Sequence, residues 1–157
     1  MSPIDIAILI ENNGGRLYLV GGAVRDEIMD RPINDYDYCI VGLSIENVLE
    51  LFPTAMSYGK SFPVFNINGN EYALARKERK TALGHKGFDV IADKNITIEE
   101  DLLRRDITIN SIAKDVLTGE YIDPYGGIED IKNKIIRATS KAFIEDPLRV
   151  YRVARFA

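Results

Sequence analysis

Asp35 and Asp37 are the residues of this sequence whose type and spacing most directly suggest chemistry. They lie two positions apart at the start of a predicted strand over 36–41, so both side chains point to the same face. Two carboxylates held so close repel each other unless a cation lies between them. Magnesium binds one or two carboxylates together with phosphate oxygens, so the pair predicts a site for Mg²⁺ beside a phosphorylated substrate. The spacing alone favours a blander interpretation, an exposed strand edge with two solvated acids, because Asp-x-Asp is common.

A second candidate is the turn at Gly21-Gly22, between a predicted strand over 16–20 and a predicted helix over 23–29. Backbone amides at a helix N-terminus bind anions, and glycine lets a phosphate approach closely. Arg25, one turn into the helix, adds a charge-assisted donor. A tight turn with a surface arginine is the alternative. No Gly-Lys-Ser/Thr follows, so this is not a Walker loop, and a phosphate site shortly before a carboxylate pair indicates nucleoside triphosphate chemistry.

Glu71 is a third candidate acid. It follows Asn68-Gly69, which separates two β-like runs over 64–67 and 71–75 and is a strong hairpin signal. In its strand Glu71 shares a face with Ala73 and Ala75, which are small and leave room for a ligand. An ordinary hairpin residue is the favoured interpretation, and the role of Glu71 stays open.

Arg104, Arg105 and Asp106 are consecutive charged residues inside a segment over 102–112 that contains five apolar residues, Leu102, Leu103, Ile107, Ile109 and Ile112. Charged groups in such a setting need partners. A sugar hydroxyl accepts a hydrogen bond from arginine and donates one to aspartate, so the triplet is a candidate ribose site. A structural ion-pair network is the other interpretation.

A final helix is predicted to begin at Asp146-Pro147 and to run to Ala157. Asp146 and Arg149 lie three positions apart and are neighbours on its surface. The carboxylate of Asp146 is an acceptor and the guanidinium of Arg149 a planar donor, a combination that matches the edge of a base. Arg152 follows three positions later on the same side of the helix. A helix cap that pairs with Arg149 explains the same residues without a ligand.

Local signals predict the elements that position these residues. Ser44 is expected to cap a helix that ends at Leu51, and the capping-box spacing of Thr97 and Glu100 predicts another helix. A second small hairpin is predicted around 118–119. The basic segment over 76–86 is expected to be a loop, either solvated or in contact with phosphate, with His85 exposed. The pattern as a whole is α+β, a small mixed sheet flanked by helices.

Composition limits the class of protein. The 157 residues carry 20 basic and 24 acidic side chains, a formal charge of −4, with 46% hydrophobic residues, which suits a globular domain rather than a disordered chain. No apolar stretch is long enough for a membrane span, and no signal peptide is visible. Cys39 is the single cysteine and fits a reducing cytoplasm, while the single histidine excludes multi-histidine zinc sites. The acidic balance argues against a nucleic-acid coat but allows a local basic groove.

Four motifs resemble those of class II CCA-adding enzymes and bacterial poly(A) polymerases, in the same order. Residues 19–26 with Asp35-Tyr36-Asp37 resemble the first motif and residues 102–110 the second. Asp123-Pro124-Tyr125-Gly126-Gly127 resembles the third and residues 145–157 the fourth. The hairpin region is most similar to bacterial CCA tRNA nucleotidyltransferases. The resemblance implies an α+β nucleotidyltransferase (polymerase β-like) head over 1–140 and the start of a neck domain over 141–157.

The resemblance also implies a reaction, the template-independent transfer of CMP and AMP from CTP and ATP to the 3′ end of tRNA. Asp35 and Asp37 would hold two Mg²⁺ ions, one activating the RNA 3′-hydroxyl and the other stabilising the leaving pyrophosphate. Gly22 and Arg25 would bind the triphosphate.

The remaining candidates take roles in nucleotide recognition by the same resemblance. Arg105 with Asp106 would read the ribose. Asp146 and Arg149 would hydrogen-bond the base edge of CTP or ATP, so that protein replaces a nucleic-acid template, and Arg152 would also touch the nucleotide.

Some features depart from the family pattern or leave alternatives open. Ile107 stands where many members have phenylalanine, and members continue through further domains that hold the tRNA. The expected partners are therefore CTP, ATP, the tRNA 3′ end and a chain that supplies RNA-binding domains. The expected location is the cytoplasm, as the single cysteine indicates. AMP addition alone, or a nucleotide-binding head with little activity without such domains, remains an alternative.

Overall fold

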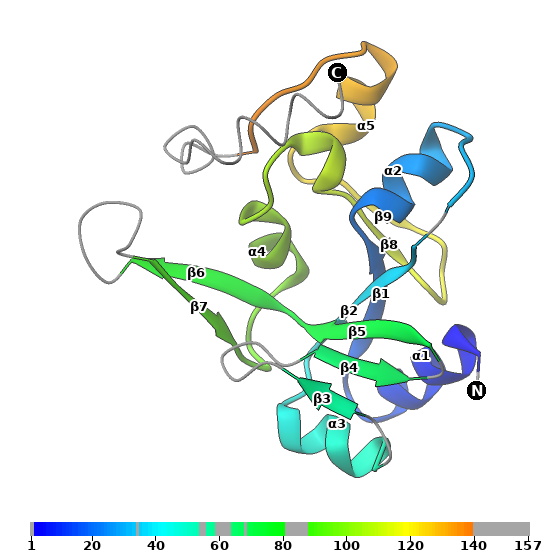
Figure 1. The fold of residues 1–157 in the computed structure, drawn as a ribbon, viewed down its shortest axis with the longest axis vertical. Helices are drawn as coiled ribbons and strands as arrows, with labels where there is room; N and C mark the ends of the chain where they lie inside the picture. The colour runs from blue at the N-terminus through cyan, green and yellow to red at the C-terminus, as the bar shows by residue number, and fades with distance from the viewer. Residues whose placement is uncertain are drawn as a thin grey trace.

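The computed structural model describes residues 2–33, 35–53, 56–58, 64–67, 69–80 and 88–139 (Figure 1). The elements are, in order, α1 (Pro3–Asn12), β1 (Arg16–Val20), α2 (Gly22–Ile28), β2 (Asp37–Val41), α3 (Ile45–Leu51), β3 (Met56–Tyr58), β4 (Val64–Ile67), β5 (Asn70–Leu74), β6 (Arg76–Lys80), β7 (Phe88–Ala92), α4 (Ile98–Leu103), the 3-10 helix η2 (Thr108–Asn110), β8 (Ala113–Asp115), β9 (Tyr121–Ile122) and α5 (Gly127–Lys132).

Seven of the described strands form one sheet in the order β3-β4-β5-β2-β1-β8-β9. Only the central pair β2 and β5 is parallel, and every other neighbouring pair is antiparallel. The predicted α+β class with a small mixed sheet is therefore confirmed. The predicted hairpin of β4 and β5 is also present, and Gly69 in its turn has a φ of 87°, a conformation that favours glycine.

Capping boxes open three of the helices. The side chains of Ser44 and Thr97 accept from the backbone N–H groups of Asn47 and Glu100, as the sequence predicts for α3 and α4. Ser2 caps α1 in the same way, a helix that the sequence analysis did not predict. Each cap satisfies amides that have no partner inside the helix, and is worth about 1 kcal/mol.

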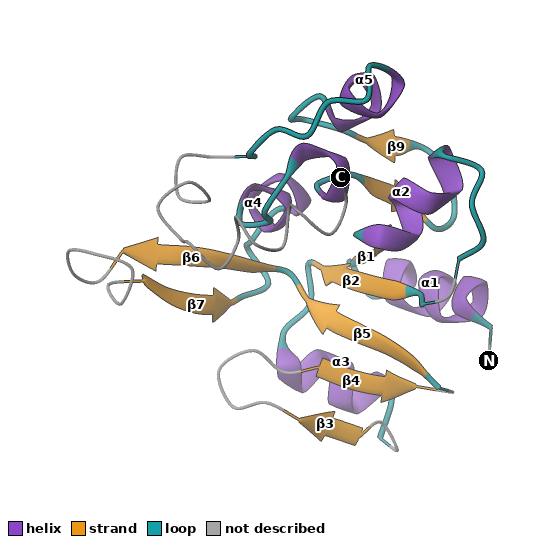
Figure 2. Cartoon of the chain, turned by 45° about the horizontal axis from the view of Figure 1, so that its top comes forward, coloured by secondary structure: helices purple, strands orange, loops and turns teal. Residues whose placement is uncertain are grey.

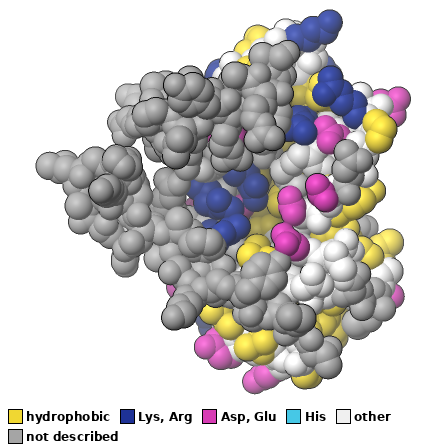
Figure 3. All heavy atoms as spheres, viewed as in Figure 1, with side chains coloured by type: hydrophobic (Ala, Val, Ile, Leu, Met, Phe, Trp, Pro, Cys, Tyr) yellow, Lys and Arg dark blue, Asp and Glu magenta, His cyan; other side chains and the backbone are white. Residues whose placement is uncertain are grey.

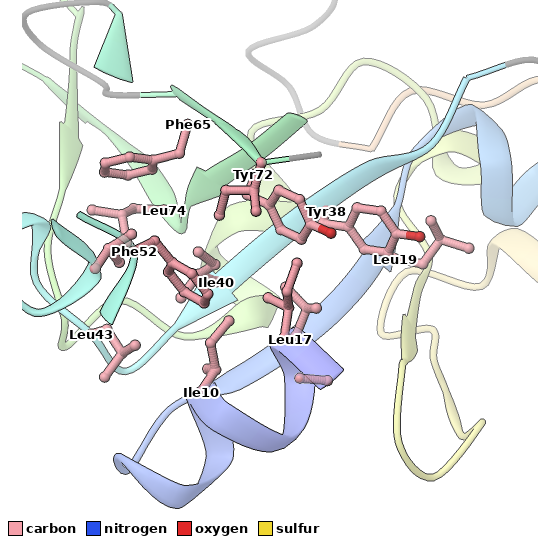
Figure 4. Close-up of a cluster of buried hydrophobic side chains, with 14 of the residues drawn as sticks. Ile10, Leu17, Leu19, Tyr38, Ile40, Leu43, Phe52, Phe65, Tyr72 and Leu74 are labelled. Carbon is pink, nitrogen blue, oxygen red and sulfur yellow. The ribbon is translucent and has the colours of Figure 1, made fainter. Parts of the chain in front are cut away.

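One face of the sheet packs against α1, α2 and α3. Its core contains strand side chains such as Leu17, Ile40 and Leu74 together with Ile10 of α1 (Figure 4). Tyr38 and Tyr72 stack here, with ring centroids 4.8 Å apart and planes 13° from parallel. Burying one such aliphatic side chain contributes about 1.5–3 kcal/mol, so this face supplies most of the apolar core.

The opposite face is covered by α4. Cys39 and Val20 on the strands pack there with Ile98 and Leu102 of α4. Because side chains alternate along a strand, burial of Tyr38 on the first face directs Asp37 to the face that α4 covers. The core therefore decides which way the first candidate residue points.

The prediction of a loop over 76–86 is wrong for its first part. Residues Arg76–Lys80 form strand β6, which pairs antiparallel with β7 and projects from the sheet as a two-stranded ribbon (Figure 2). A strand composed only of charged residues lacks the apolar alternation from which a strand is predicted. Backbone hydrogen bonds to the partner strand hold it in place instead.

Several expectations lie outside the described residues. They are His85, the helix predicted to begin at Asp146-Pro147, and with it Arg149 and Arg152. Among the described helices, none is both long and apolar enough to cross a bilayer.

Candidate functional site

Three carboxylates line one hollow beside the central parallel strands. Asp35, just before β2, shares this hollow of about 430 Å³ with Asp37 and Glu71. Asp37 and Glu71 are register partners on β2 and β5, so their side chains stand on the same face of the sheet. The predicted convergence of Asp35 and Asp37 is thus present, and Glu71 joins them. The interpretation of Glu71 as an ordinary hairpin residue did not anticipate that it lines the same hollow as the two aspartates.

These carboxylates influence one another electrostatically. Burial raises the pKa of Asp37, the neighbouring Glu71 and then Asp35 raise it further, and only Arg105 acts in the opposite direction. Crowded negative charge of this kind favours a bound cation.

The donor set also fits a magnesium ion. Within the described ranges, no three His, Cys, Asp or Glu side chains form a complete metal-binding group. Mg²⁺ needs only one or two protein carboxylates when substrate phosphates and water supply the other oxygens, and Asp35 and Asp37 offer that number. The carboxylates and the amide oxygens of Asn66 and Asn70, which also line the hollow, are the kind of ligand that suits a hard cation.

Arginines form the other wall of the same cleft. A second hollow of about 180 Å³ shares Asp37 and Glu71 with the first and is lined by Arg76, Arg104 and Arg105. On the face shown in Figure 3, basic and acidic side chains gather side by side around a hollowed area. The small side chains of Cys39 and Ala73 line the hollow between these charged walls. An acidic half beside a basic half can hold a cation together with a polyanion.

Asp101 lines the same hollow as the three arginines and was not among the sequence candidates. It is 1% exposed and accepts hydrogen bonds from Nη2 of Arg105, at 2.9 Å, and from the backbone N–H of Arg76, at 2.8 Å. The Nε of Arg104 lies 3.6 Å from the same carboxylate. The i to i+3 and i to i+4 spacing on a helix was the signal that could have revealed it.

Burial lowers the pKa of Arg104 to about 10, and Asp101 works against that shift. Arg104 therefore keeps its positive charge at neutral pH. The arginine wall is cationic even though most of it is withdrawn from solvent.

The glycine turn has the predicted strand–turn–helix form. Gly21 precedes α2 with a φ of 70°, and a Cβ placed on it would lie 3.7 Å from Nη1 of Arg105. The turn and the arginine wall, distant in sequence, are therefore adjacent. Gly22, the next residue, begins α2, and a Cβ there would contact the guanidinium of Arg25.

Arg25 and Asp106 are connected through a residue that sequence reasoning missed. Nη1 of Arg25 donates to Oδ1 of Asn110 at 2.8 Å, and Nδ2 of Asn110 donates to Asp106 at 3.3 Å. Asp106 is buried and also accepts from the backbone N–H of Ile107. Neither Arg25 nor Asp106 lines the two hollows described above, so this network adjoins the carboxylate cleft rather than forming its wall.

The third motif anchors the segment that follows the second. Asp123 accepts from the backbone N–H groups of Gly127 and Ile128 at the start of α5. Asp130 of α5 then accepts from the hydroxyl of Thr108 and from Nε of Arg137. These bonds fix α5 against η2, directly after the arginines of the second motif.

Solved structures of known proteins share this architecture. The CCA-adding enzyme of Bacillus stearothermophilus in complex with CTP superimposes with a TM-score of 0.78 at 35% identity, covering 99% of this chain and 39% of that one. A tRNA nucleotidyltransferase complexed with a primer tRNA and an incoming ATP analog gives a TM-score of 0.72 at 32% identity, over 97% of this chain and 44% of the other.

Sequence comparison points the same way. The chain is 52% identical over 143 residues to the Multifunctional CCA protein of Stenotrophomonas maltophilia and 50% identical over 146 residues to that of Xanthomonas campestris pv. campestris. Each alignment covers 90% of this chain but only 35% and 34% of the relative, so the chain spans about a third of their length. Residues 17–137 match the family model described as the Poly A polymerase head domain. With that match over most of its length, the chain belongs to the Poly A polymerase head domain family.

Proposed function

We propose that this chain is the nucleotidyltransferase head of an enzyme that transfers CMP and AMP from CTP and ATP to the 3′ end of tRNA. The observation that carries the proposal is the cleft formed by two hollows that share Asp37 and Glu71, with Asp35 lining one and Arg104 and Arg105 lining the other. Such a cleft matches a metal-bound nucleoside triphosphate, which presents a cation and a polyanion together. Among nucleotidyltransferases, the similarity to CCA proteins supports the enzymes that add CCA to tRNA.

Asp35 and Asp37 would hold two Mg²⁺ ions in this proposal. When bound, the metal supplies charge stabilisation for an in-line displacement at the α-phosphorus. Glu71 adds a third negative charge beside Asp37 and strengthens the attraction for cations. Arg104 and Arg105 would neutralise the substrate without needing to move, because Asp101 already restrains them.

The other candidates keep the roles that their motifs suggest. Gly22 and Arg25 would contact the triphosphate, and Arg105 with Asp106 would contact the ribose. Asp146, Arg149 and Arg152 would select the base. We further propose a cytoplasmic location and assign residues 1–140 to the head and 141–157 to the start of a neck.

AMP addition alone is the second candidate, and the description of the matching family favours it. The same cleft would serve both reactions, because both join a nucleoside monophosphate to an RNA 3′-hydroxyl. A third possibility is a head that binds nucleotides but needs further RNA-binding domains for efficient transfer.

Extension of a tRNA lacking its 3′-terminal CCA separates these candidates. The full chain is incubated with Mg²⁺ and CTP alone, ATP alone, or both, and the products are resolved by length. Calorimetry measures the binding of CTP and of ATP. CCA addition predicts growth by two residues with CTP and by three with both nucleotides. A long tail with ATP alone indicates the second candidate, and CTP binding without extension indicates the third. A chain that neither extends the RNA nor binds either nucleotide contradicts the proposal.

Asp35→Ala tests the metal assignment within the same assay. We expect loss of Mg²⁺-dependent transfer with an unchanged circular dichroism spectrum. Glu50→Ala is the matched control, because Glu50 is an exposed acid on α3, on the other side of the sheet. Extension by the Asp35 variant at the parent rate would remove Asp35 from the site.

A further inference from the structure

The buried carboxylate of Asp101 pairs with Arg104 and Arg105, which line the cleft beside it. We propose that Asp101 is a positioning residue for nucleotide recognition, which holds the guanidinium of Arg105 in the orientation that meets the ribose of the bound nucleotide. This inference rests on the proposed function, since it assumes that the cleft takes a nucleoside triphosphate.

The contacts restrict Arg105 from one side only. Nη2 of Arg105 donates to Oδ1 of Asp101 at 2.9 Å, while its Nη1 lies toward the turn at Gly21. Its Nε is buried and makes no hydrogen bond to any described part of the chain. A guanidinium has five N–H donors in a rigid plane, so one fixed edge sets the direction of the others. Asp101 therefore orients the guanidinium of Arg105, and Nη1, which lies toward Gly21, is the group directed to a ligand.

The charge balance of the cluster shows why a carboxylate is needed. Arg104 and Arg105 are adjacent in sequence and both face Asp101, with side chains 19% exposed, whereas Asp101 is almost fully buried. Neighbouring guanidinium groups repel each other: burial lowers the pKa of Arg104, and the charge of Arg105 lowers it further. One carboxylate between them offsets this repulsion and leaves a net positive charge toward the cleft, where an anionic substrate would lie.

The neighbouring elements hold Asp101 itself in place. It lies on α4, whose Leu102 is buried against the sheet, and its Oδ2 accepts the backbone N–H of Arg76 at the start of β6. The carboxylate thus cannot follow a displaced arginine, because it is anchored to two elements. A carboxylate held this rigidly transmits its position to Arg105.

Asp101→Asn is the informative variant, because the amide keeps the shape and one acceptor but removes the charge. Calorimetry in Mg²⁺ would give the Kd of the full chain for CTP and for 2′-deoxy-CTP. We expect the wild type to prefer CTP and the variant to lose about tenfold in CTP affinity with a smaller loss for 2′-deoxy-CTP, as removing a charged hydrogen bond implies. A merely structural role would weaken both nucleotides equally. Glu99→Gln, which removes the same charge from an exposed position on α4, should change neither Kd.

A double-mutant cycle tests whether Asp101 acts through Arg105. In an Arg105→Ala background, Asp101→Asn should change the Kd for CTP less than twofold, because the residue it positions is gone. If Asp101→Asn fails to fold, Asp101→Glu is used instead, because it keeps the charge and displaces it by one methylene. We expect this variant to prefer CTP over 2′-deoxy-CTP less strongly than the wild type does, but still to show some preference.

The outcomes separate this inference from the proposed function. Two results would overturn the positioning role while leaving the proposed function intact. One is a preference for CTP in the Asp101 variants equal to that of the wild type. The other is a loss of CTP affinity on Asp101→Asn that is as large in the Arg105→Ala background as in the wild type. A wild-type chain that binds neither nucleotide overturns both.

Discussion

Asp37 and Glu71 stand directly opposite each other on β2 and β5, which among the described strands form the only parallel pair of the seven-stranded sheet. Their side chains point to the face that α4 covers, and Asp35 lines the same hollow. Burial raises the pKa of Asp37, and repulsion by the neighbouring carboxylates raises it further. A cation that relieves this repulsion is what the arrangement favours.

Glu71→Gln should therefore have opposite effects with and without metal. Removing one negative charge relieves Asp37, so the melting temperature of the metal-free chain should rise by about 1 °C, the scale of a few tenths of a kcal/mol at an exposed site. The additional stabilisation by Mg²⁺ should become smaller. Differential scanning calorimetry with and without Mg²⁺ measures both, with Glu50→Gln as the control. A larger Mg²⁺ effect in the Glu71 variant would contradict the attraction that we assign to this carboxylate.

Asn110→Ala should weaken binding of the triphosphate part of the nucleotide. The amide of Asn110 joins Arg25 to Asp106, so its loss frees the Arg25 side chain from one of its restraints. We expect the affinity for CTP to fall about three- to tenfold, the range of one hydrogen bond, and that for CMP to change less. Calorimetry of both nucleotides measures the difference, with the exposed Asn12→Ala as control. Equal losses for CTP and CMP would separate Arg25 from the triphosphate.

Gly127→Ala should destabilise the fold. A Cβ on Gly127 would lie 2.2 Å from the backbone oxygen of Thr108 and 2.8 Å from a side-chain carbon of Ile112, so α5 would have to move away from η2. Overpacking of this kind costs about 1–3 kcal/mol. Urea unfolding should show a lower midpoint with an unchanged slope. Gly119→Asn is the control, because asparagine tolerates a φ of 76° and nothing lies within 4 Å of that position. A midpoint equal to that of the parent chain would mean that α5 is not packed as described.

The contribution of Asp101 to stability should depend on pH in the acidic range. Burial alone would raise the pKa of Asp101, but Arg105, Arg104 and the backbone N–H of Arg76 bring it below 3.8. A carboxyl with a lowered pKa stabilises the fold above the pKa of the unfolded chain, and this stabilisation is lost as pH falls through the folded value. The difference in unfolding free energy between the wild type and Asp101→Asn should be constant from about pH 5 to pH 8 and shrink below about pH 4. Urea titrations across this range measure it, and a difference that grows in acid would contradict the sign of the shift.

Arg149→Ala should loosen the choice among nucleotides more than it weakens metal binding. Arg149 lies outside the described residues, so its templating role stays a prediction from the fourth motif. The preference for CTP over UTP in tRNA extension should fall by about tenfold or more, the scale of one bidentate base contact. An unchanged preference would count against that role.

Local physics explains what could be predicted from the sequence. Strand β1, the hairpin of β4 and β5 and the caps of α3 and α4 depend on residues close together in the chain, and all were predicted. The Asp35 and Asp37 pair was equally local, since two positions on one short segment share a face by the period of the strand. Where apolar alternation is missing, as in β6, the same reasoning fails, because a charged strand is defined only by its partner β7.

Relationships between distant segments were decided only by the tertiary structure. Glu71 reaches Asp37 because β5 pairs with β2 across the central parallel register, which no local signal specifies. Asp101 and Arg105 are close in sequence, but the burial of Asp101 depends on the packing of α4 against the sheet, which also brings the backbone N–H of Arg76 to its carboxylate. The sequence alone therefore determined which residue types are present and how those short segments fold that carry local signals such as caps, turns and apolar alternation. Packing decided which charges meet, because the free energy of a charge depends on its burial and on neighbours that the fold brings from elsewhere.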